Sequence, residues 1–215
     1  MRDLSSVLAL LPVAVLLALS WGMARQLGHP RGWMGRRWMS RMLNDANRTM
    51  LDAAVEAVDA RSGECIVDVG FGGGHTLERL RPIVAPRRPV GIEISEAMVD
   101  AARERWGDAV ETHLADVVSL PLADASADGV ISVNTLYFWP DPAAALREIR
   151  RVLRPGGRLV LGVRRPGMMR LVPITWFGFR LRSAARVQDL LRAAGFDVRV
   201  VEKVQGELTF VARVA

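Results

Sequence analysis

The segment Cys65-Ile66-Val67-Asp68-Val69-Gly70-Phe71-Gly72-Gly73-Gly74-His75 decides the fold of this 215-residue chain. Its first five residues are apolar except for Asp68, which predicts a short buried strand. The glycines that follow allow a sharp turn and a close approach of the backbone to a ligand, and a helix starting at His75 would offer free N–H groups there. The order acid-x-G-x-G-x-G differs from the dinucleotide pattern G-x-G-x-x-G, and the chain has no G-x-x-x-x-G-K-[ST], so hydrolysis of a nucleoside triphosphate is not supported.

Strands and helices alternate along the chain on both sides of this segment. Apolar runs predict further strands at residues 90–94, 110–115, 129–133, 157–163, 196–201 and 208–214. Helical spacing predicts helices at 44–59, from 75 onward, at 95–105 with Ser95 as its N-cap, at 142–153 and at 186–194. This alternation is typical of an α/β protein with a doubly wound sheet.

Composition excludes several classes of protein. Half of the residues are apolar and 24% are charged, which is typical of a folded chain. Cys65 is the single cysteine and the three histidines are widely spaced, so neither a disulfide scaffold nor a metal site is expected.

The N-terminus carries a long apolar run. Residues 4–24 hold no charge, and a helix of that length would measure about 31 Å, close to the thickness of a bilayer. Arg25 and further arginines follow, so residues 1–27 are predicted to form a hydrophobic helix that anchors the chain in a membrane, with the remainder in the cytoplasm. A signal peptide cleaved near Ala18-Leu19-Ser20, a helix lying in the membrane plane or packed on the domain, and a true start at Met23 are the alternatives.

Two segments are strongly basic. Residues 28–48 alternate arginine with tryptophan and methionine, and they are predicted to form a juxtamembrane linker and the start of a helix. Residues 164–186 hold six arginines and no acid among large apolar side chains. Such segments indicate that the chain binds an anionic surface. Because they lie near a run of membrane length, a lipid surface is a simpler interpretation than a nucleic acid.

Four motifs in order give the chain a family resemblance. They are Asp68 to Gly74, Gly91-Ile92-Glu93-Ile94-Ser95, Ala115-Asp116, and Leu153-Arg154-Pro155-Gly156-Gly157-Arg158-Leu159. Over residues 44–215 the chain resembles the class I S-adenosylmethionine-dependent methyltransferases of the type 11 and quinone-methyltransferase-like small-molecule group. The resemblance implies a Rossmann-like seven-stranded sheet with the last strand antiparallel, in a domain at 49–215 with a cap segment at 164–185, and S-adenosylmethionine as cofactor.

The resemblance also implies a cofactor site. The resemblance implies that the loop of Gly70, Phe71, Gly72 and Gly74 admits the methionine and ribose portions of the cofactor, with Asp68 near the ammonium group. It implies that Glu93 accepts hydrogen bonds from both ribose hydroxyls. It also implies that Asp116 and the N–H of Val117 bind the adenine, and that Ile94 and Val117 flank the faces of the adenine. A carboxylate at the end of a strand can accept two hydroxyl hydrogen bonds, which fits the role of Glu93.

The reacting centre is implied to lie after the fourth strand. Asn134, Tyr137 and Trp139 are the candidate catalytic residues, with Asn134 also near the cofactor; the alternative is that these aromatic residues only pack the domain. The segment lacks the two prolines of [N/D]-P-P-[Y/F], which argues against methylation of a nucleic-acid base. His75, directly after Gly74, is expected to contact the cofactor carboxylate or to donate to neighbouring backbone groups, and His113 is interpreted as structural.

The expected function is therefore methyl transfer from S-adenosylmethionine to a lipophilic small molecule at a membrane surface. The apolar and basic cap segment motivates the lipophilic acceptor. A non-catalytic cofactor-binding membrane module and, less favoured, an RNA methyltransferase are the alternatives. The sequence leaves open the acceptor atom, any catalytic base and the oligomeric state.

Overall fold

The computed structural model describes residues 4–28, 40–201 and 206–214, with the side chains of all of these except residues 4–12, 40, 41, 43 and 168. Its α-helices are α1 (Leu4–Gly28), α3 (Ser40–Val58), α4 (His75–Val84), α5 (Glu96–Trp106), α6 (Pro142–Val152), α7 (Pro166–Met169) and α8 (Ala184–Ala193). Short 3-10 helices are η2 (Gly107–Ala109), η3 (Leu136–Phe138) and η4 (Pro173–Trp176). The strands are β1 (Ile66–Val69), β2 (Val90–Glu93), β3 (Glu111–Leu114), β4 (Ala127–Val133), β5 (Leu153–Arg164), β6 (Phe196–Val201) and β7 (Glu207–Val214).

The strands form one seven-stranded sheet in the order β3-β2-β1-β4-β5-β7-β6. The pairs among β3, β2, β1, β4 and β5 are parallel, and β7 runs antiparallel to both β5 and β6. The prediction of a doubly wound α/β sheet with its last strand antiparallel is confirmed. The strand order reverses between β1 and β4, and the carboxyl edge at this point is where α/β sheets bind ligands.

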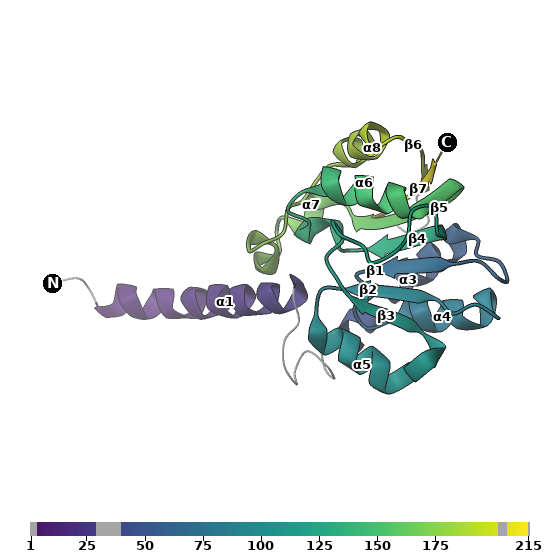
Figure 1. Ribbon diagram of the computed structural model, residues 1–215. Helices are drawn as coiled ribbons and strands as arrows, with labels where there is room; N and C mark the ends of the chain where they lie inside the picture. The colour runs from purple at the N-terminus through teal and green to yellow at the C-terminus, as the bar shows by residue number, and fades with distance from the viewer. Residues whose placement is uncertain (1–3, 29–39, 202–205, 215) are drawn as a thin grey trace.

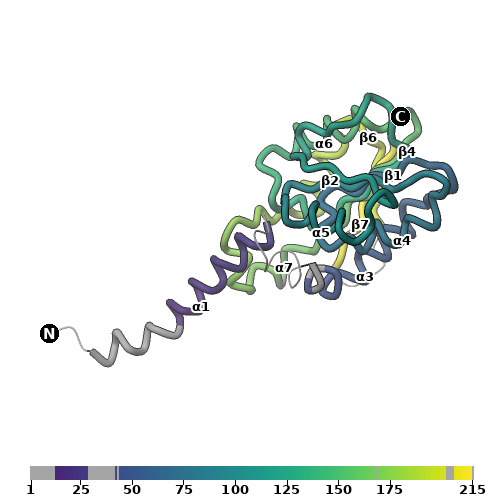
Figure 2. Tube along the Cα trace, turned by 60° about the horizontal axis from the view of Figure 1, so that its bottom comes forward, coloured from purple at the N-terminus to yellow at the C-terminus, as the bar shows by residue number. Residues whose placement is uncertain are grey.

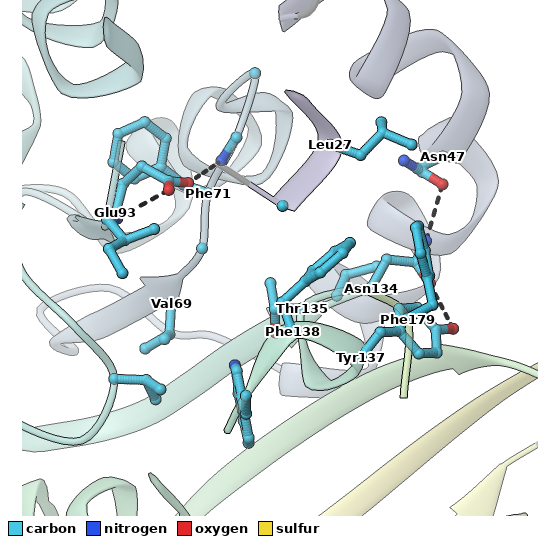
Figure 3. Close-up of a pocket in the computed structure, with 18 of the residues that line it drawn as sticks. Leu27, Asn47, Val69, Phe71, Glu93, Asn134, Thr135, Tyr137, Phe138 and Phe179 are labelled. Atoms are coloured by element: carbon cyan, nitrogen blue, oxygen red, sulfur yellow. Dashed lines mark hydrogen bonds between the residues drawn. The ribbon is translucent and has the colours of Figure 1, made fainter. Parts of the chain in front are cut away.

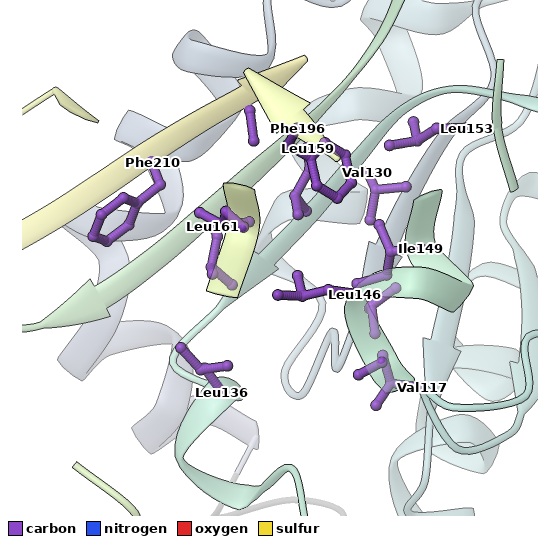
Figure 4. Close-up of a cluster of buried hydrophobic side chains, with 14 of the residues drawn as sticks. Val117, Val130, Leu136, Leu146, Ile149, Leu153, Leu159, Leu161, Phe196 and Phe210 are labelled. Atoms are coloured by element: carbon purple, nitrogen blue, oxygen red, sulfur yellow. The ribbon is translucent and has the colours of Figure 1, made fainter. Parts of the chain in front are cut away.

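The central strands are buried on both faces, as their unbroken apolar runs predicted. Every residue of β1, β2 and β4 is buried. Leu146 and Ile149 of α6 pack with Val130 and Leu159 on one face of the sheet (Figure 4). Residues of α3 and α4 pack on Ile66, Ile131 and Val160, which form a second cluster. Because side chains alternate along a strand, neighbouring residues of β1 face different helices.

Two of the helix starts follow directly from capping chemistry. The Ser95 hydroxyl accepts from the N–H of Met98, as predicted, and the Asp141 carboxylate accepts from the N–H of Ala144 at the start of α6. Each cap fixes a helix directly after a segment that reaches the carboxyl edge of the sheet.

Two segments differ from what the sequence predicted. β5 begins at Leu153, which pairs with Ala127, so it starts four residues before the strand predicted at 157–163. The cap segment 164–185 contains α7 and η4. Much of the predicted linker 28–48 lies outside the described residues, and α3 begins at Ser40.

Helix α1 leans against the domain at its C-terminal end and projects away from it at the other (Figure 1, Figure 2). Ala24 is buried, and Met23 and Leu27 pack beside the apolar cluster that contains Phe71. This is one of the alternatives that the sequence allowed, a helix packed on the domain.

The membrane location predicted from the apolar run at residues 4–24 is wrong. Within the part of the chain whose side chains the structure describes, no helix is both long and apolar enough to cross a membrane.

Candidate functional site

The glycine loop forms one wall of a cavity of about 660 Å³ at the carboxyl edge of the sheet. β1 ends at Val69, and the chain turns through Gly70, Gly72 and Gly74, which have φ angles of 75°, 51° and 75°. At Gly70 the space is also needed, because a Cβ there would overlap the side chain of Thr135. The loop is therefore a backbone surface that a ligand approaches without meeting side chains.

Glu93 lies at the end of β2 and faces this loop. Its carboxylate accepts from the backbone N–H groups of Gly72 (3.0 Å), Ile94 (2.8 Å) and Ser95 (3.1 Å). Burial raises the pKa of Glu93, and the three hydrogen bonds oppose that rise because they favour the charged form. Both carboxylate oxygens are thus held in place: Oε1 accepts two N–H groups and Oε2 accepts one, which leaves acceptor capacity at Oε2 for a ligand in the cavity.

Asp68 lies beneath the loop instead of on the cavity wall. It is 3% exposed and accepts a hydrogen bond from the hydroxyl of Thr76 on α4. Burial, and then the nearby charge of Glu93, raise the pKa of Asp68 well above its usual range. Asp68 and Gly74 do not line the cavity, so their contact with a cofactor stays a prediction.

The other predicted cofactor residues line the cavity together. They are Gly70, Phe71, Gly72, Glu93, Ile94, Asp116, Val117 and Asn134. Asp116 and Val117 come directly after β3 and lie beside Ile94, because β3 and β2 are adjacent parallel strands. The residues predicted to bind the adenine thus lie beside the residue predicted to bind the ribose, and these roles stay a prediction.

The segment after β4 builds the other end of the cavity (Figure 3). Asn134 has a φ of 58°, a left-handed conformation that asparagine tolerates better than most residues. Its side-chain amide donates to Asn47 on α3 (2.8 Å), and its side-chain oxygen accepts from the hydroxyl of Tyr137 (3.1 Å). Tyr137 and Trp139, the other candidate catalytic residues, are buried and also line the cavity.

The hydroxyl of Tyr137 is fully engaged. It donates to Asn134 and accepts from the backbone N–H of Arg164. Burial raises the pKa of Tyr137 to about 12. This hydroxyl therefore ties η3 to β5 and is a poor general base near neutral pH.

Replacing Tyr137 by phenylalanine tests whether the hydroxyl stabilises the fold or takes part in catalysis. We expect the free energy of unfolding to fall by about 1–2 kcal/mol, because the buried N–H of Arg164 loses its acceptor. Urea titration measures this loss, and calorimetry should show cofactor affinity unchanged. A fall of a hundredfold or more in turnover with unchanged stability would instead assign the hydroxyl to catalysis.

The sequence did not predict the wall of the cavity that α3 and Arg164 form. Asn44 on α3 donates to the carbonyl of Gly73 (3.0 Å), which holds α3 against the glycine loop. Arg164 of β5 donates from its guanidinium to the carbonyl of Ala46 (2.9 Å) and to Asn47 (3.3 Å). The spacing of Asn44 and Asn47, one turn apart at the start of a predicted helix, was the available signal for this wall.

Apolar side chains complete the far end of the cavity. They come from α1, η3 and the cap segment, and they include Leu27, Phe138, Met169, Val172, Ile174 and Phe179. The rings of Phe138 and Phe179 meet edge to face at 4.7 Å between centroids. The cavity thus has a polar end at Glu93 and an apolar end beneath the cap.

His75 and His113 lie away from this site. His75 bonds Asp52 through Nε2 (2.8 Å) and joins α4 to α3, and His113 bonds Glu111 on β3 (2.8 Å). Neither residue is among those that line the cavity, so the expected contact of His75 with the cofactor stays a prediction.

The sheet order, the glycine loop after β1 and the carboxylate at the end of β2 agree with the resemblance to the class I S-adenosylmethionine-dependent methyltransferases. The family described as a methyltransferase domain matches residues 67–161, from β1 into β5. This match supports a class I S-adenosylmethionine-dependent methyltransferase, with S-adenosylmethionine as its cofactor. The residues present fit that cofactor, because an open glycine backbone stands beside a fixed carboxylate with acceptor capacity left.

Curated relatives and a solved structure agree with this assignment. The chain is 38% identical over 149 residues to the O-methyltransferase cnsE of Penicillium expansum, a match that covers 63% of this chain and 53% of that protein. It is 35% identical over 128 residues to the 27-O-demethylrifamycin SV methyltransferase of Amycolatopsis mediterranei, covering 57% and 47%. The chain thus spans about half the length of these relatives. A SAM-dependent methyltransferase from Aquifex aeolicus shares the fold with a TM-score of 0.69 at 23% identity, covering 82% of this chain and 97% of that one.

Proposed function

We propose that this chain methylates an oxygen atom of an apolar small molecule that ionises without help from a protein base. The observation that carries the proposal is the two-ended cavity, with Glu93 and the glycine loop at one end and the apolar cap at the other. The relatives named O-methyltransferases support oxygen as the acceptor atom. A cavity beside the cofactor end also favours an enzyme over a module that only binds the cofactor.

The titratable groups on the cavity wall restrict the acceptor. Among the lining residues that the structure describes, they are Glu93, Asp116, Tyr137 and Arg164. Glu93 and Asp116 lie at the cofactor end, and the hydroxyl of Tyr137 is engaged with a raised pKa. With no base at the apolar end, the acceptor should lose its proton to water, as a phenol, an enol or a carboxylic acid does.

The chain's part in the reaction is then positioning and exclusion of water. S-adenosylmethionine, held by the glycine loop and Glu93, would supply an activated methyl group for transfer to the acceptor oxygen, with the neutral thioether as the leaving group. The glycine loop and Glu93 hold the cofactor, while the apolar side chains of Phe138 and Phe179 surround the acceptor and keep water away from it. Such positioning can supply most of the acceleration of a displacement that needs no covalent step with the protein.

This proposal predicts a pH profile set by the acceptor. For the full-length chain with methyl-labelled S-adenosylmethionine and a panel of apolar phenols, kcat/KM should fall about tenfold per pH unit below each phenol's own pKa. The pKa of Tyr137, at about 12, lies above the assay range and should contribute no inflection between pH 6 and 10. Scintillation counting of extracted product gives the rates.

The contrary results are equally concrete. One inflection at the same pH for every phenol would reveal a base on the protein. Labelled methyl transferred to none of the phenols, enols or carboxylic acids offered, by a chain that still binds the cofactor, would refute oxygen methylation.

A further inference from the structure

A second cavity, of about 850 Å³, lies between α1 and the segment that contains η4. α1 runs past the cap at this place (Figure 1, Figure 2). Four of the ten residues that line this cavity are aromatic: Trp21 on α1, and Phe138, Trp176 and Phe177. Arg25 and Gln26 of α1 also line it. We call this cavity the α1 groove.

The α1 groove adjoins the apolar end of the first cavity. Gly28 and Phe138 line both of them. A Cβ on Gly28 would lie 3.1 Å from Cδ1 of Phe138, so the partition between the cavities consists of a bare backbone and the edge of one ring. A glycine here lets the end of α1 approach the ring without closing the space on either side of it.

The groove presents aromatic surface that the rest of the domain leaves uncovered. Trp21 is 50% exposed and Trp176 is 59% exposed. The indole N–H of Trp176 donates to the carbonyl of Arg170 (2.8 Å), which fixes the ring, and the guanidinium of Arg25 stacks 4.8 Å from the centre of the Trp21 ring. Fixed aromatic faces beside a reaction cavity are well suited to hold an extended apolar group.

We infer that the acceptor is an elongated molecule whose reacting oxygen lies in the first cavity and whose apolar tail passes Gly28 and Phe138 into the α1 groove. The inference rests on the proposed function, because it assigns the tail of the same acceptor. The two cavities share Gly28 and Phe138 in their linings, and this adjacency selects the occupant. Trp21 and Trp176 are then specificity-determining residues that act on the tail and not on the transferred methyl group.

The test uses n-alkyl esters of 4-hydroxybenzoic acid, from methyl to octyl, as phenol acceptors for the full-length chain. For the unchanged protein we expect KM to fall as the alkyl group lengthens. Trp21→Ala and Trp176→Ala should raise KM for the octyl ester about tenfold and leave KM for the methyl ester unchanged. Leu19→Ala is the matched control, because Leu19 is 68% exposed on the same helix and does not line the groove.

Calorimetry with the octyl ester separates this inference from the proposed function. Tight binding that weakens in the two tryptophan variants, without methyl transfer, would place the tail in the groove and refute the reaction. The assignment of the tail to the α1 groove would be overturned if the methyl ester is methylated and KM does not depend on chain length. It would also be overturned if Leu19→Ala changes KM as much as Trp21→Ala does. A change of oligomeric state in the tryptophan variants, with KM unaltered, would also overturn it by assigning the groove to a second copy.

Discussion

Replacing Glu93 by alanine should weaken binding of S-adenosylmethionine about one hundredfold, measured as the dissociation constant by calorimetry. The ribose would lose a charged acceptor for two hydroxyl groups, and charge-assisted hydrogen bonds contribute about 1.5–3 kcal/mol each. The change also removes the acceptor of three backbone N–H groups, those of Gly72, Ile94 and Ser95. The glycine loop would then lose its link to β2 as well as its ligand.

Two further variants sharpen this prediction. Glu93→Gln keeps the size of the side chain and one acceptor oxygen, so its loss of affinity should be intermediate. Glu96→Ala, three residues further on and exposed, should bind the cofactor like the unchanged chain. An unaltered dissociation constant in Glu93→Ala would show that the ribose is not bound at the end of β2.

Replacing Arg158 by methionine should lower the free energy of unfolding by about 3–5 kcal/mol, the usual cost of removing one partner of a buried ion pair. Arg158 is 7% exposed and makes two hydrogen bonds to the carboxylate of Glu64, at 3.1 and 2.6 Å. It also donates to the carbonyls of Val58 and Asp59 at the end of α3 and to that of Asp128. Methionine fills a similar volume but removes the donor to these carbonyls, and Glu64 keeps the N–H of Arg61 while losing both bonds from Arg158.

Guanidinium chloride titration measures the loss, and Arg147→Met on the exposed face of α6 is the control, with an expected change of about 0.5 kcal/mol or less. The pH dependence gives a second readout. The hydrogen bonds from Arg158 hold the pKa of Glu64 below its usual range, so this pair stabilises the fold above the unfolded-state pKa of Glu64 and less as the pH falls through the folded-state value. The acid-induced loss of stability should be smaller in Arg158→Met, and an identical slope in both proteins would contradict the assignment.

Much of the sheet and of the cofactor end could be predicted because both depend on local patterns. Buried strands such as β1 and β4 are continuous apolar runs, and Gly70 and Gly72 need backbone conformations that favour glycine. Glu93 could be placed because it ends the strand next to β1. For Asp68 the pattern could not distinguish a carboxylate that faces a ligand from one that bonds Thr76 below the loop.

The far wall could not be predicted, because residues distant in the chain assemble it. Arg164 reaches Ala46 across 118 positions, and Leu27 and Gly28 arrive from a helix that precedes the domain. The membrane prediction failed for a related reason. Hydropathy reports that a run avoids water, and it does not tell lipid from a protein surface such as the one on which Ala24 is buried.

The contacts at the two ends of α3 make this helix a mechanical link across the sheet. Arg158 anchors its last residue, Val58, while Asn44 and Asn47 near its start bond the glycine loop and Asn134. A helix of 19 residues spans about 28 Å, so α3 joins the contacts at Val58 to the wall of the first cavity that Asn44 and Asn47 build. We expect loosening of the contacts at Val58 to disturb that wall, so activity should be lost on heating before the sheet itself unfolds.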